Sequence, residues 1–423
     1  MKTKLLGKIA LFASVSLLTL QTNAQDASKN VKQKFLDQRG KPSLIVFNEK
    51  SSYKESDSQK AFKEQLDLKD NSNFTKTKSE KDKLGFLHEK FQLFHQGLKV
   101  EFSTYTLHSK SGKLESMSGE FYQLDNVNTN ATLSKEQAFK SALKEIGATK
   151  YLWDSPAEAT FNDYKKPEGE LVLLPITDED VTGKKNQQLR LAYKFDIYAT
   201  NPVSRGDIYI DAVTGNSLFY NATIKHLGEY SHGAKKIGKT ENKNTATAFV
   251  AANAATRYSG NQTIQTASSG GSYILSDATR GNGIMTYNMN KGTNYSAAVN
   301  FTDADNNWTA AEYNNVNKDN GALDAHWGAE KTYDYWTSVH GRNSFDNAGA
   351  AIKSYVHYSS NYDNAYWNGS VMTYGDGSGT YFDILTSIDV AAHEIGHAIC
   401  SNTANLAYQL ESGAMNEAFS DIW

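Results

Sequence analysis

The chain contains a single cysteine, Cys400, among its 423 residues. One cysteine cannot form a disulfide within the chain, so the fold must rest on apolar cores and bound ions. The chain also has no apolar stretch long enough to cross a membrane. Its 44 Lys and Arg nearly balance its 47 Asp and Glu, giving a net charge of −3. This balance argues neither for nor against a charged partner, and no nucleic-acid partner is predicted.

The amino terminus has the pattern of a secretory signal. Lysines within the first eight residues precede an apolar run from Ile9 to Leu20, and the small-residue segment Thr22-Asn23-Ala24 follows. These are the basic, apolar and cleavage regions of a signal peptide, and the apolar run is too short for a membrane span. We therefore predict a signal peptide at residues 1–24 and a secreted protein with no membrane attachment after its removal.

The rest of the chain predicts an α+β, multi-domain protein. Its three parts are residues 25–130, residues 131–225 and residues 226–423. The first two combine strands with a helix, and the third has a β-rich beginning and a helical end. At this length, two to four domains with their own cores are expected.

The first two parts have recognisable local signals. Residues 25–58 are mostly polar and predict a loosely ordered lead-in, apart from one short strand at Leu44–Phe47. Apolar and polar residues then alternate, as in strands, with a turn expected at Gly97. Residues 132–147 predict an amphipathic helix capped by Ser134 or Thr132.

Near the end of the chain, His393-Glu394-Ile395-Gly396-His397 fills the H-E-x-x-H pattern. Side chains four residues apart lie on one face of a helix, so both imidazoles can reach one zinc ion. Glu394 is then placed to accept a proton from a zinc-bound water. The pentapeptide alone is a weak signal, because it also occurs by chance.

A second segment, E-S-G-A-M-N-E, ends at Glu417, with 19 residues between it and His397. A hydrolytic zinc site needs three protein ligands and one open position, and Glu417 can supply the third ligand from a second helix. Asp421 lies one turn further on, where it can accept the outer N–H of a ligand histidine. The alternative for either acid is a solvated charge on a helix surface.

With these motifs, the chain resembles the thermolysin-like neutral zinc metallopeptidases. Residues 25–130 resemble a fungalysin/thermolysin propeptide module, and residues 131–225 resemble a PepSY module. Residues 226–423 resemble the catalytic domain, beginning with a candidate linker and maturation region. The segments N-A-Y-W-N-G from Asn364 and M-T-Y-G-D-G from Met372 also match the family.

Two other zinc architectures fit less well. Metzincins need a further glycine and histidine at positions that are Cys400 and Thr403 here. Zinc aminopeptidases also use a downstream glutamate, but their spacing is one residue shorter by resemblance. The sequence therefore favours the endopeptidase.

The resemblance implies further site residues. Tyr408 would hydrogen-bond the developing oxyanion, although an interfacial core tyrosine is the alternative. Asn364 and Ala365 would hold the substrate backbone as an added strand. Protein or peptide substrates are expected, with the chain's own prosegment as an intramolecular inhibitor.

Calcium is a further expectation. By resemblance, Asp389 matches a calcium ligand, and the D-x-D-x-N run of Asp303, Asp305 and Asn307 is similar to a second, loop-borne calcium site. Solvated loop acids explain the run equally well.

Two expectations follow for the chain as a whole. It would be a secreted zinc endopeptidase precursor whose helical carboxyl-terminal subdomain is missing after Trp423, and it would therefore be an inactive fragment. The alternative is a non-catalytic product whose prosegment acts as a folding aid or inhibitor.

Overall fold

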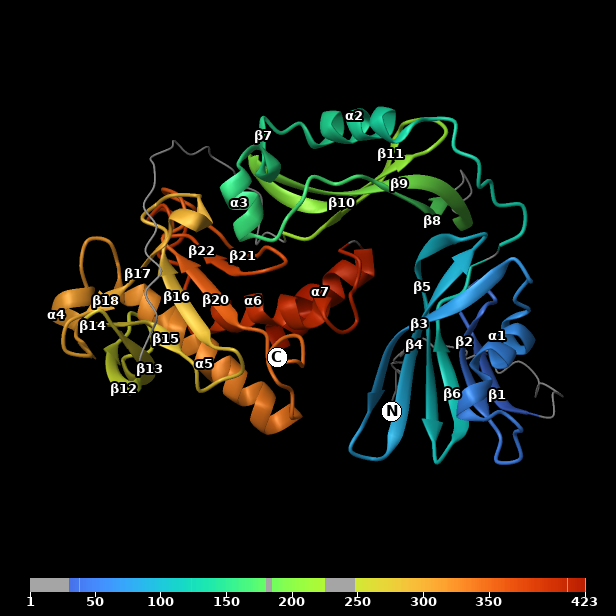
Figure 1. The fold of residues 1–423 in the computed structure, drawn as a ribbon, viewed down its shortest axis with the longest axis horizontal. Helices are drawn as coiled ribbons and strands as arrows, with labels where there is room; N and C mark the ends of the chain where they lie inside the picture. Colours follow the sequence, from blue (N-terminus) through green and yellow to red (C-terminus); the bar gives the residue numbers. More distant parts are fainter. Residues whose placement is uncertain are drawn as a thin grey trace, which may run out of the picture. The chain divides into compact units, whose positions relative to one another are not determined.

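The computed structural model describes residues 30–37, 39–122, 124–179, 185–224, 248–408 and 410–422 (Figure 1). The predicted signal peptide and most of the predicted linker lie outside these residues. The chain forms two compact units. Unit 1 comprises Met1–Thr129 and Val172–Arg190, and unit 2 comprises Asn130–Leu171 and Leu191–Trp423.

Unit 1 is a twisted sheet covered by one helix, α1 (Ser58–Leu66). Antiparallel pairing gives the order β1-β2-β6-β5, with β4 beside β5 and β3 beside β4. The strands are β1 (Val31–Leu36), β2 (Pro42–Phe47), β3 (Ser72–Lys81), β4 (Phe86–His95), β5 (Leu98–Lys110) and β6 (Lys113–Gly119). Phe62 of α1 lies 4.2 Å from the ring of Phe74 and 5.1 Å from that of Phe91, which joins the helix to the sheet.

Strand β8 (Glu170–Glu179) adds to the sheet of unit 1 from further along the chain. It runs parallel to β5, with Val172 opposite Lys99 and Leu173 opposite Val100. Val172 and Leu173 are fully buried. The sheet of unit 1 therefore includes a strand that the sequence places after residue 130.

Of three features that the sequence predicts within residues 25–147, two are confirmed and one is wrong. The turn at Gly97 is confirmed, because Gln96 (φ 50°) and Gly97 (φ 81°) form a two-residue hairpin turn. The helix is confirmed as α2 (Lys135–Ile146), with Ser134 as its N-cap. The loosely ordered lead-in is wrong, because β1 pairs with β2 and Tyr53 is fully buried.

The first part of unit 2 is a helix-and-sheet module, residues 130–171 and 191–224. It contains α2, η2 (Leu152–Asp154), α3 (Pro156–Phe161), β7 (Lys150–Tyr151), the end of β9 (Lys185–Asn201), β10 (Val203–Asp211) and β11 (Ser217–Ala222). Strand β10 lies between β9 and β11 with antiparallel pairing. The turn between β10 and β11 has the pattern D-x-x-T-G, from Asp211 to Gly215. Asp211 Oδ1 accepts hydrogen bonds from the amides of Val213 and Thr214 and so fixes this hairpin.

The second part of unit 2, residues 248–422, contains the helices predicted to bind zinc and is called the zinc module. Its first sheet has the order β18-β14-β13-β12-β19, and its second has β15-β16-β20-β22-β21, with β17 beside β16. The strands are β12 (Ala248–Ala255), β13 (Asn261–Ser269), β14 (Ser272–Ile274), β15 (Ser276–Asp277), β16 (Ile284–Asn288), β17 (Val299–Asn300), β18 (Thr302–Asp303), β19 (Asn307–Trp308), β20 (Ile352–Val356), β21 (Ala365–Trp367) and β22 (Met372–Tyr374). The short helices are η3 (Tyr295–Ala297) and α4 (Ala310–Tyr313).

Three long helices follow one another in the zinc module: α5 (Asn320–His340), α6 (Ile388–Ser401) and α7 (Leu410–Ile422) (Figure 1). Glycines allow them to approach closely. A Cβ at Gly328 of α5 would lie 3.0 Å from Ala391 Cβ, and a Cβ at Gly396 of α6 would lie 2.8 Å from Ser420 Cα of α7. Helix α6 is therefore fixed between the other two.

Helix α6 is central to the apolar core of the zinc module. Ala391, Ile395, Ala398 and Ile399 are buried there among side chains of α5 and both sheets. Cys400 is also buried and is a free thiol. No helix among the described residues is both long and apolar enough to span a membrane.

Candidate metal centre

Helix α6 carries His393 and His397 on one face. Their ring centroids are 4.5 Å apart and the rings are nearly perpendicular. Both residues are buried, with exposures of 6% for His393 and 2% for His397. The helical spacing of four residues thus brings the two imidazoles together, as the sequence predicts.

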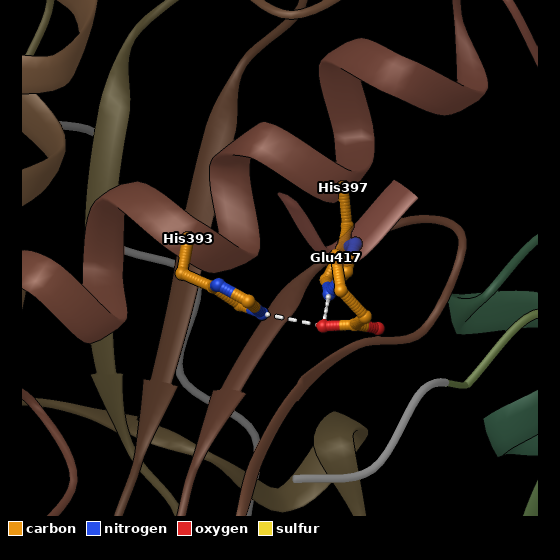
Figure 2. A group of neighbouring side chains, drawn as sticks. All are labelled: His393, His397 and Glu417. Atoms are coloured by element: carbon orange, nitrogen blue, oxygen red, sulfur yellow. Dashed lines mark ion pairs between the residues drawn. The ribbon is translucent and has the colours of Figure 1, made fainter. Parts of the chain in front are cut away.

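Helix α7 brings Glu417 to the same place (Figure 2). Glu417 Oε2 lies 3.2 Å from His393 Nε2 and 3.5 Å from His397 Nε2. Around a tetrahedral zinc ion with bonds of about 2.0–2.1 Å, neighbouring ligand atoms lie about 3.3 Å apart. The donor chemistry of all three groups, and the distances from the carboxylate to both nitrogens, therefore fit a zinc ion.

The outer ring nitrogens of both histidines are hydrogen-bonded to α7. His393 Nδ1 lies 2.7 Å from Asp421 Oδ1, and His397 Nδ1 lies 2.8 Å from Asn416 Oδ1. Ser420 Oγ is also 3.0 Å from His397 Nδ1. Acceptors at Nδ1 favour the tautomer whose Nε2 lone pair is free for a metal.

Asn416 and Ser420 are site residues that sequence reasoning missed. Both are buried: Asn416 is fully buried, and Ser420 is only 2% exposed. Their positions, one residue before and three residues after Glu417, place them on the inner side of α7. That spacing was the available signal, but polar residues in a helix are usually solvated.

Glu394 lies beside the cluster and is held from the sheet. The amide of Trp367, the last residue of β21, donates to Glu394 Oε2 at 2.8 Å. The glutamate is only 1% exposed. A buried carboxylate needs such a partner, and this bond fixes the orientation of Glu394 relative to β21.

Tyr408 precedes α7 and contacts the cluster directly. Its hydroxyl donates to Glu417 Oε1 at 2.5 Å. Its backbone amide donates to Asn221 Oδ1 of β11 at 2.8 Å. The tyrosine is therefore in the site, and its role as an oxyanion donor stays a prediction.

The electrostatics of the metal-free cluster follow from these contacts. Burial alone would lower the pKa of His393, but hydrogen bonds to Glu417 and Asp421 and the charge of Glu394 raise it to about 9. Burial alone would raise the pKa of Glu417, but bonds with His393 and Tyr408 lower it to about 2. Burial, and then the bond to Glu417, raises the pKa of the Tyr408 hydroxyl. The carboxylate is thus charged at neutral pH, as a metal ligand requires.

Asn364 and Ala365 lie at the edge of the second sheet. Strand β21 is the last in its order and pairs only with β22, antiparallel, within the described sheet. Asn364 Oδ1 accepts a bond from the amide of Ala365 at 2.9 Å. The other edge of a terminal strand can pair with an extended peptide.

The candidate calcium ligands are not part of the cluster of His393, His397 and Glu417. Asp303 Oδ1 accepts from the amides of Asp305 and Asn307, both at 3.1 Å, so the run folds as a tight turn on its own backbone. Tyr313 donates to Asp303 Oδ2 at 3.1 Å. Asp389 is exposed in the first turn of α6. Calcium binding stays a prediction for both places.

A cavity of about 380 Å³ lies apart from the metal centre. Its lining includes Arg257, Asn320 and Asp383, and Arg257 Nη2 is 2.5 Å from Asp383. None of its lining residues belongs to the zinc cluster. We therefore base the chemistry on the histidine–glutamate cluster and not on this cavity.

Fold and site together define a metallopeptidase-type zinc centre, in which a helix with two histidines meets a glutamate from the next helix. The profile described as "Thermolysin metallopeptidase, catalytic domain" matches residues 251–401, and the profile "Fungalysin/Thermolysin Propeptide Motif" matches residues 72–121. The chain belongs to the thermolysin family of zinc metallopeptidases.

Several curated proteins are similar to the chain over most of its length. Bacillolysin of Brevibacillus brevis is 34% identical over 345 residues, which are 79% of this chain and 56% of that protein. Thermolysin of Bacillus caldolyticus is 36% identical over 350 residues, which are 81% of this chain and 58% of that protein. The chain thus spans little more than half the length of these relatives.

One solved structure, the precursor of protealysin from Serratia proteamaculans, is 32% identical over 33% of this chain and 41% of that chain. Its TM-score is 0.28.

Proposed function

We propose that the protein is the precursor of a secreted zinc endopeptidase, and that His393, His397 and Glu417 hold the metal. The observation that supports this most directly is the meeting of two Nε2 atoms and one carboxylate within 4.8 Å of one another. Family membership implies zinc, and the donor set suits it. Proteins or peptides are the proposed substrates, and the histidine-bearing helix is the proposed centre of catalysis.

A zinc ion held there supplies Lewis-acid chemistry that activates a water molecule towards a peptide carbonyl. Glu394 is the proposed general base, which accepts a proton from water and later delivers it to the leaving nitrogen. The bond from the Trp367 amide keeps the Glu394 carboxylate in place for both transfers. Water attacks directly in this scheme, and no acyl-enzyme forms.

Two neighbouring elements would orient the substrate. Strand β21 offers an edge to an extended peptide, with Asn364 and Ala365 as the proposed binding residues. The Tyr408 hydroxyl would turn from Glu417 to the developing oxyanion, where one donor contributes about 2.7–4 kcal/mol. Asp421 would act through His393, as a positioning residue.

The family also suggests how the chain is made and controlled. We propose that residues 1–24 direct export and that residues 25–225 form an inhibitory prosegment. Calcium, at Asp389 or at the turn of Asp303, Asp305 and Asn307, would stabilise the zinc module. These roles rest on resemblance, and the sequence patterns support them.

Two glutamine variants test the assignment of the two glutamates. We expect Glu417→Gln to weaken zinc binding, because it replaces a charged ligand by a neutral one. We expect Glu394→Gln to bind zinc as the parent does but to lose hydrolysis, because Glu394 transfers protons and does not bind the metal. Metal analysis and casein hydrolysis, with each variant made in a chain extended to the length of the curated relatives, measure the two effects separately.

The exposed Glu411, on the first turn of α7, provides the matched control as Glu411→Gln. It should change neither zinc content nor hydrolysis. Complete loss of zinc from Glu394→Gln would contradict the separation of roles. An extended chain that binds zinc but never hydrolyses peptides would favour the non-catalytic alternative.

A further inference from the structure

Two histidines of unit 1 face each other across neighbouring strands. His88 of β4 and His108 of β5 are directly opposite in the antiparallel ladder, so both imidazoles project from the same face of the sheet. Their Nδ1 atoms are 2.7 Å apart, and their ring centroids are 5.0 Å apart. In the zinc cluster, the ring centroids of His393 and His397 are 4.5 Å apart. The spacing of the two histidine pairs is therefore similar.

The outer ring nitrogens of this pair also have hydrogen-bond partners. His88 Nε2 lies 3.3 Å from Asp82 Oδ2, and His108 Nε2 lies 3.3 Å from Ser118 Oγ of β6. Histidines that bind metals in proteins are usually held in this way, because a partner at the outer nitrogen fixes the tautomer and the orientation of the ring.

These contacts decide where the protons of the pair lie. An ionised carboxylate only accepts hydrogen bonds, so neutral His88 carries its proton on Nε2 and directs its Nδ1 lone pair at His108. In the metal-free pair, His108 therefore donates its Nδ1 proton to His88. The Ser118 hydroxyl can donate or accept, so it also suits the other tautomer of His108, which has its proton on Nε2. A cation can thus replace the shared proton between the two Nδ1 atoms.

The pair is also accessible enough to receive an ion. The side chain of His88 is 35% exposed, and His108 is half-buried. Around a tetrahedral zinc ion neighbouring ligand atoms lie about 3.3 Å apart, so the two Nδ1 atoms must separate by about 0.6 Å. Rotation of two partly exposed rings provides this separation, and water can fill the other positions around the ion.

We propose that His88 and His108 bind one divalent transition-metal ion, with Asp82 and Ser118 as positioning residues for the two rings. Imidazole nitrogen suits zinc, copper and nickel ions, whereas calcium prefers oxygen ligands. The ion joins β4 to β5 within unit 1 and stabilises the folded sheet, because the two ligands come together only in the folded state. This site is separate from the zinc cluster and goes beyond the proposed function.

The test uses the full chain with His393→Ala and His397→Ala, which remove the zinc cluster. Isothermal titration calorimetry with zinc chloride counts the sites that remain, and excess calcium chloride occupies any oxygen-rich site. We expect one zinc ion per chain. We expect the additional substitution His88→Ala or His108→Ala to abolish this binding, because one imidazole does not form a chelate.

The role of Asp82 has its own variant, Asp82→Asn. Asp82 Oδ1 accepts bonds from the amides of Leu84 and Phe86, and asparagine keeps this oxygen. Its amide nitrogen would replace Oδ2 and could not accept the proton of His88 Nε2. We expect zinc affinity to fall about 10-fold or more, while the metal-free stability in urea stays close to that of the parent.

Two substitutions serve as matched controls. Glu115→Gln removes an exposed carboxylate of β6, and His340→Ala removes an exposed histidine outside the pair. Neither should change the number of zinc ions bound or their affinity. Because His88→Ala could disturb the hairpin of β4 and β5, a second measurement leaves unit 1 unchanged. Electron paramagnetic resonance of one copper(II) ion bound to the chain without the zinc cluster should show coupling to two imidazole nitrogens.

The inference is refuted if the chain without the zinc cluster binds no zinc, since the pair would then share only a proton. It is also refuted if His88→Ala and His108→Ala bind zinc as before, or if the copper signal shows fewer than two nitrogens. The proposed function fails in a different experiment. A chain that carries His88→Ala but keeps His393 and His397 would then bind no zinc.

Discussion

Around the zinc cluster, the two residues that orient the histidines differ in exposure. Asp421, which accepts from His393, has a side chain that is 70% exposed, whereas Asn416, which contacts His397, is fully buried. A hydrogen bond that competes with water contributes less than one in the interior. His397 is therefore held more firmly than His393. Loss of the Asp421 contact to His393 and loss of the Asn416 contact to His397 should therefore have different effects on the protein.

The contact to His393 gives the first prediction. We expect Asp421→Ala to lower zinc affinity about 10–100-fold while leaving the folding stability close to that of the parent, because only an exposed side chain is lost. Asp421→Asn keeps an acceptor oxygen and should lose less. Competition with a chromogenic chelator measures the affinity. An affinity for Asp421→Ala equal to that of the parent would show that the contact does not orient His393.

His326 of α5 gives a second prediction, concerning acid stability. Its Nε2 lies 2.9 Å from the Gln265 carbonyl and its Nδ1 lies 2.9 Å from Thr286 Oγ1, so the neutral ring satisfies both partners. Complete burial lowers its pKa from 6.5 to about 4. The folded state thus resists protonation of His326, and the contribution of this residue to stability should fall by roughly 3 kcal/mol as the pH drops from 6.5 to 4.

Glu330, 3.6 Å from His326, works in the opposite direction. Burial raises its pKa to about 7, so its own contribution to stability grows as the pH falls from 7 towards 4.5. His326→Gln, which keeps a donor for the Gln265 carbonyl, isolates the histidine. Urea unfolding across this pH range should give a smaller loss of stability in acid for His326→Gln than for the parent. Parallel curves would refute the assignment.

At the scale of elements, periodic motifs were readable from the sequence, and contacts between elements were not. The zinc helices, α2 and the hairpin turn at Gly97 follow from local spacing, since each depends on residues a few positions apart. Strand β1 was missed because half of its segment, VKQKFL, is polar and only its first residue is buried in the hairpin. Asn416 was missed because its spacing from Glu417 would be the same on a solvated helix face, which is where polar side chains usually lie.

Helix α6 illustrates such a contact, and Gly396 tests it. A methyl group there would lie 2.8 Å from Ser420 Cα, so α7 must move away. Overpacking costs about 1–3 kcal/mol, and the better helix propensity of alanine returns up to about 1 kcal/mol. We expect Gly396→Ala to reduce stability in urea and also zinc affinity, because Glu417 moves with α7. Ser338→Ala, at an exposed position of α5, should change neither.

Both effects must appear together in Gly396→Ala. A variant that is less stable but binds zinc as the parent does would show that the cluster tolerates movement of α7. The same stability and the same affinity would show that a Cβ at Gly396 does not lie as close as 2.8 Å to Ser420 Cα.

At the scale of the whole molecule, the compact units are not continuous stretches of sequence. Unit 1 takes Val172–Arg190 from the middle of a segment that otherwise belongs to unit 2. The chain therefore passes from unit 1 to unit 2, returns for β8, and passes to unit 2 again. Composition and motifs place boundaries along the sequence, so a returning strand cannot be found by them. Only the pairing of β8 with β5 reveals it.

The returning strand gives the last prediction. A fragment of residues 30–129 lacks β8 and thus the buried side chains of Val172, Leu173 and Leu174. Burial of one such side chain contributes about 1.5–3 kcal/mol, so the fragment should lose most of its stability and bind a dye for exposed apolar surface. Joining residues 170–176 to Thr129 through a flexible glycine–serine linker should restore cooperative unfolding, since the strand can again pair with β5.

The matched control is the same linked fragment with Leu173→Asp, which should stay unstable because a charge would replace a fully buried side chain. If residues 30–129 unfold as cooperatively as the linked fragment, β8 is dispensable and unit 1 is complete before residue 130.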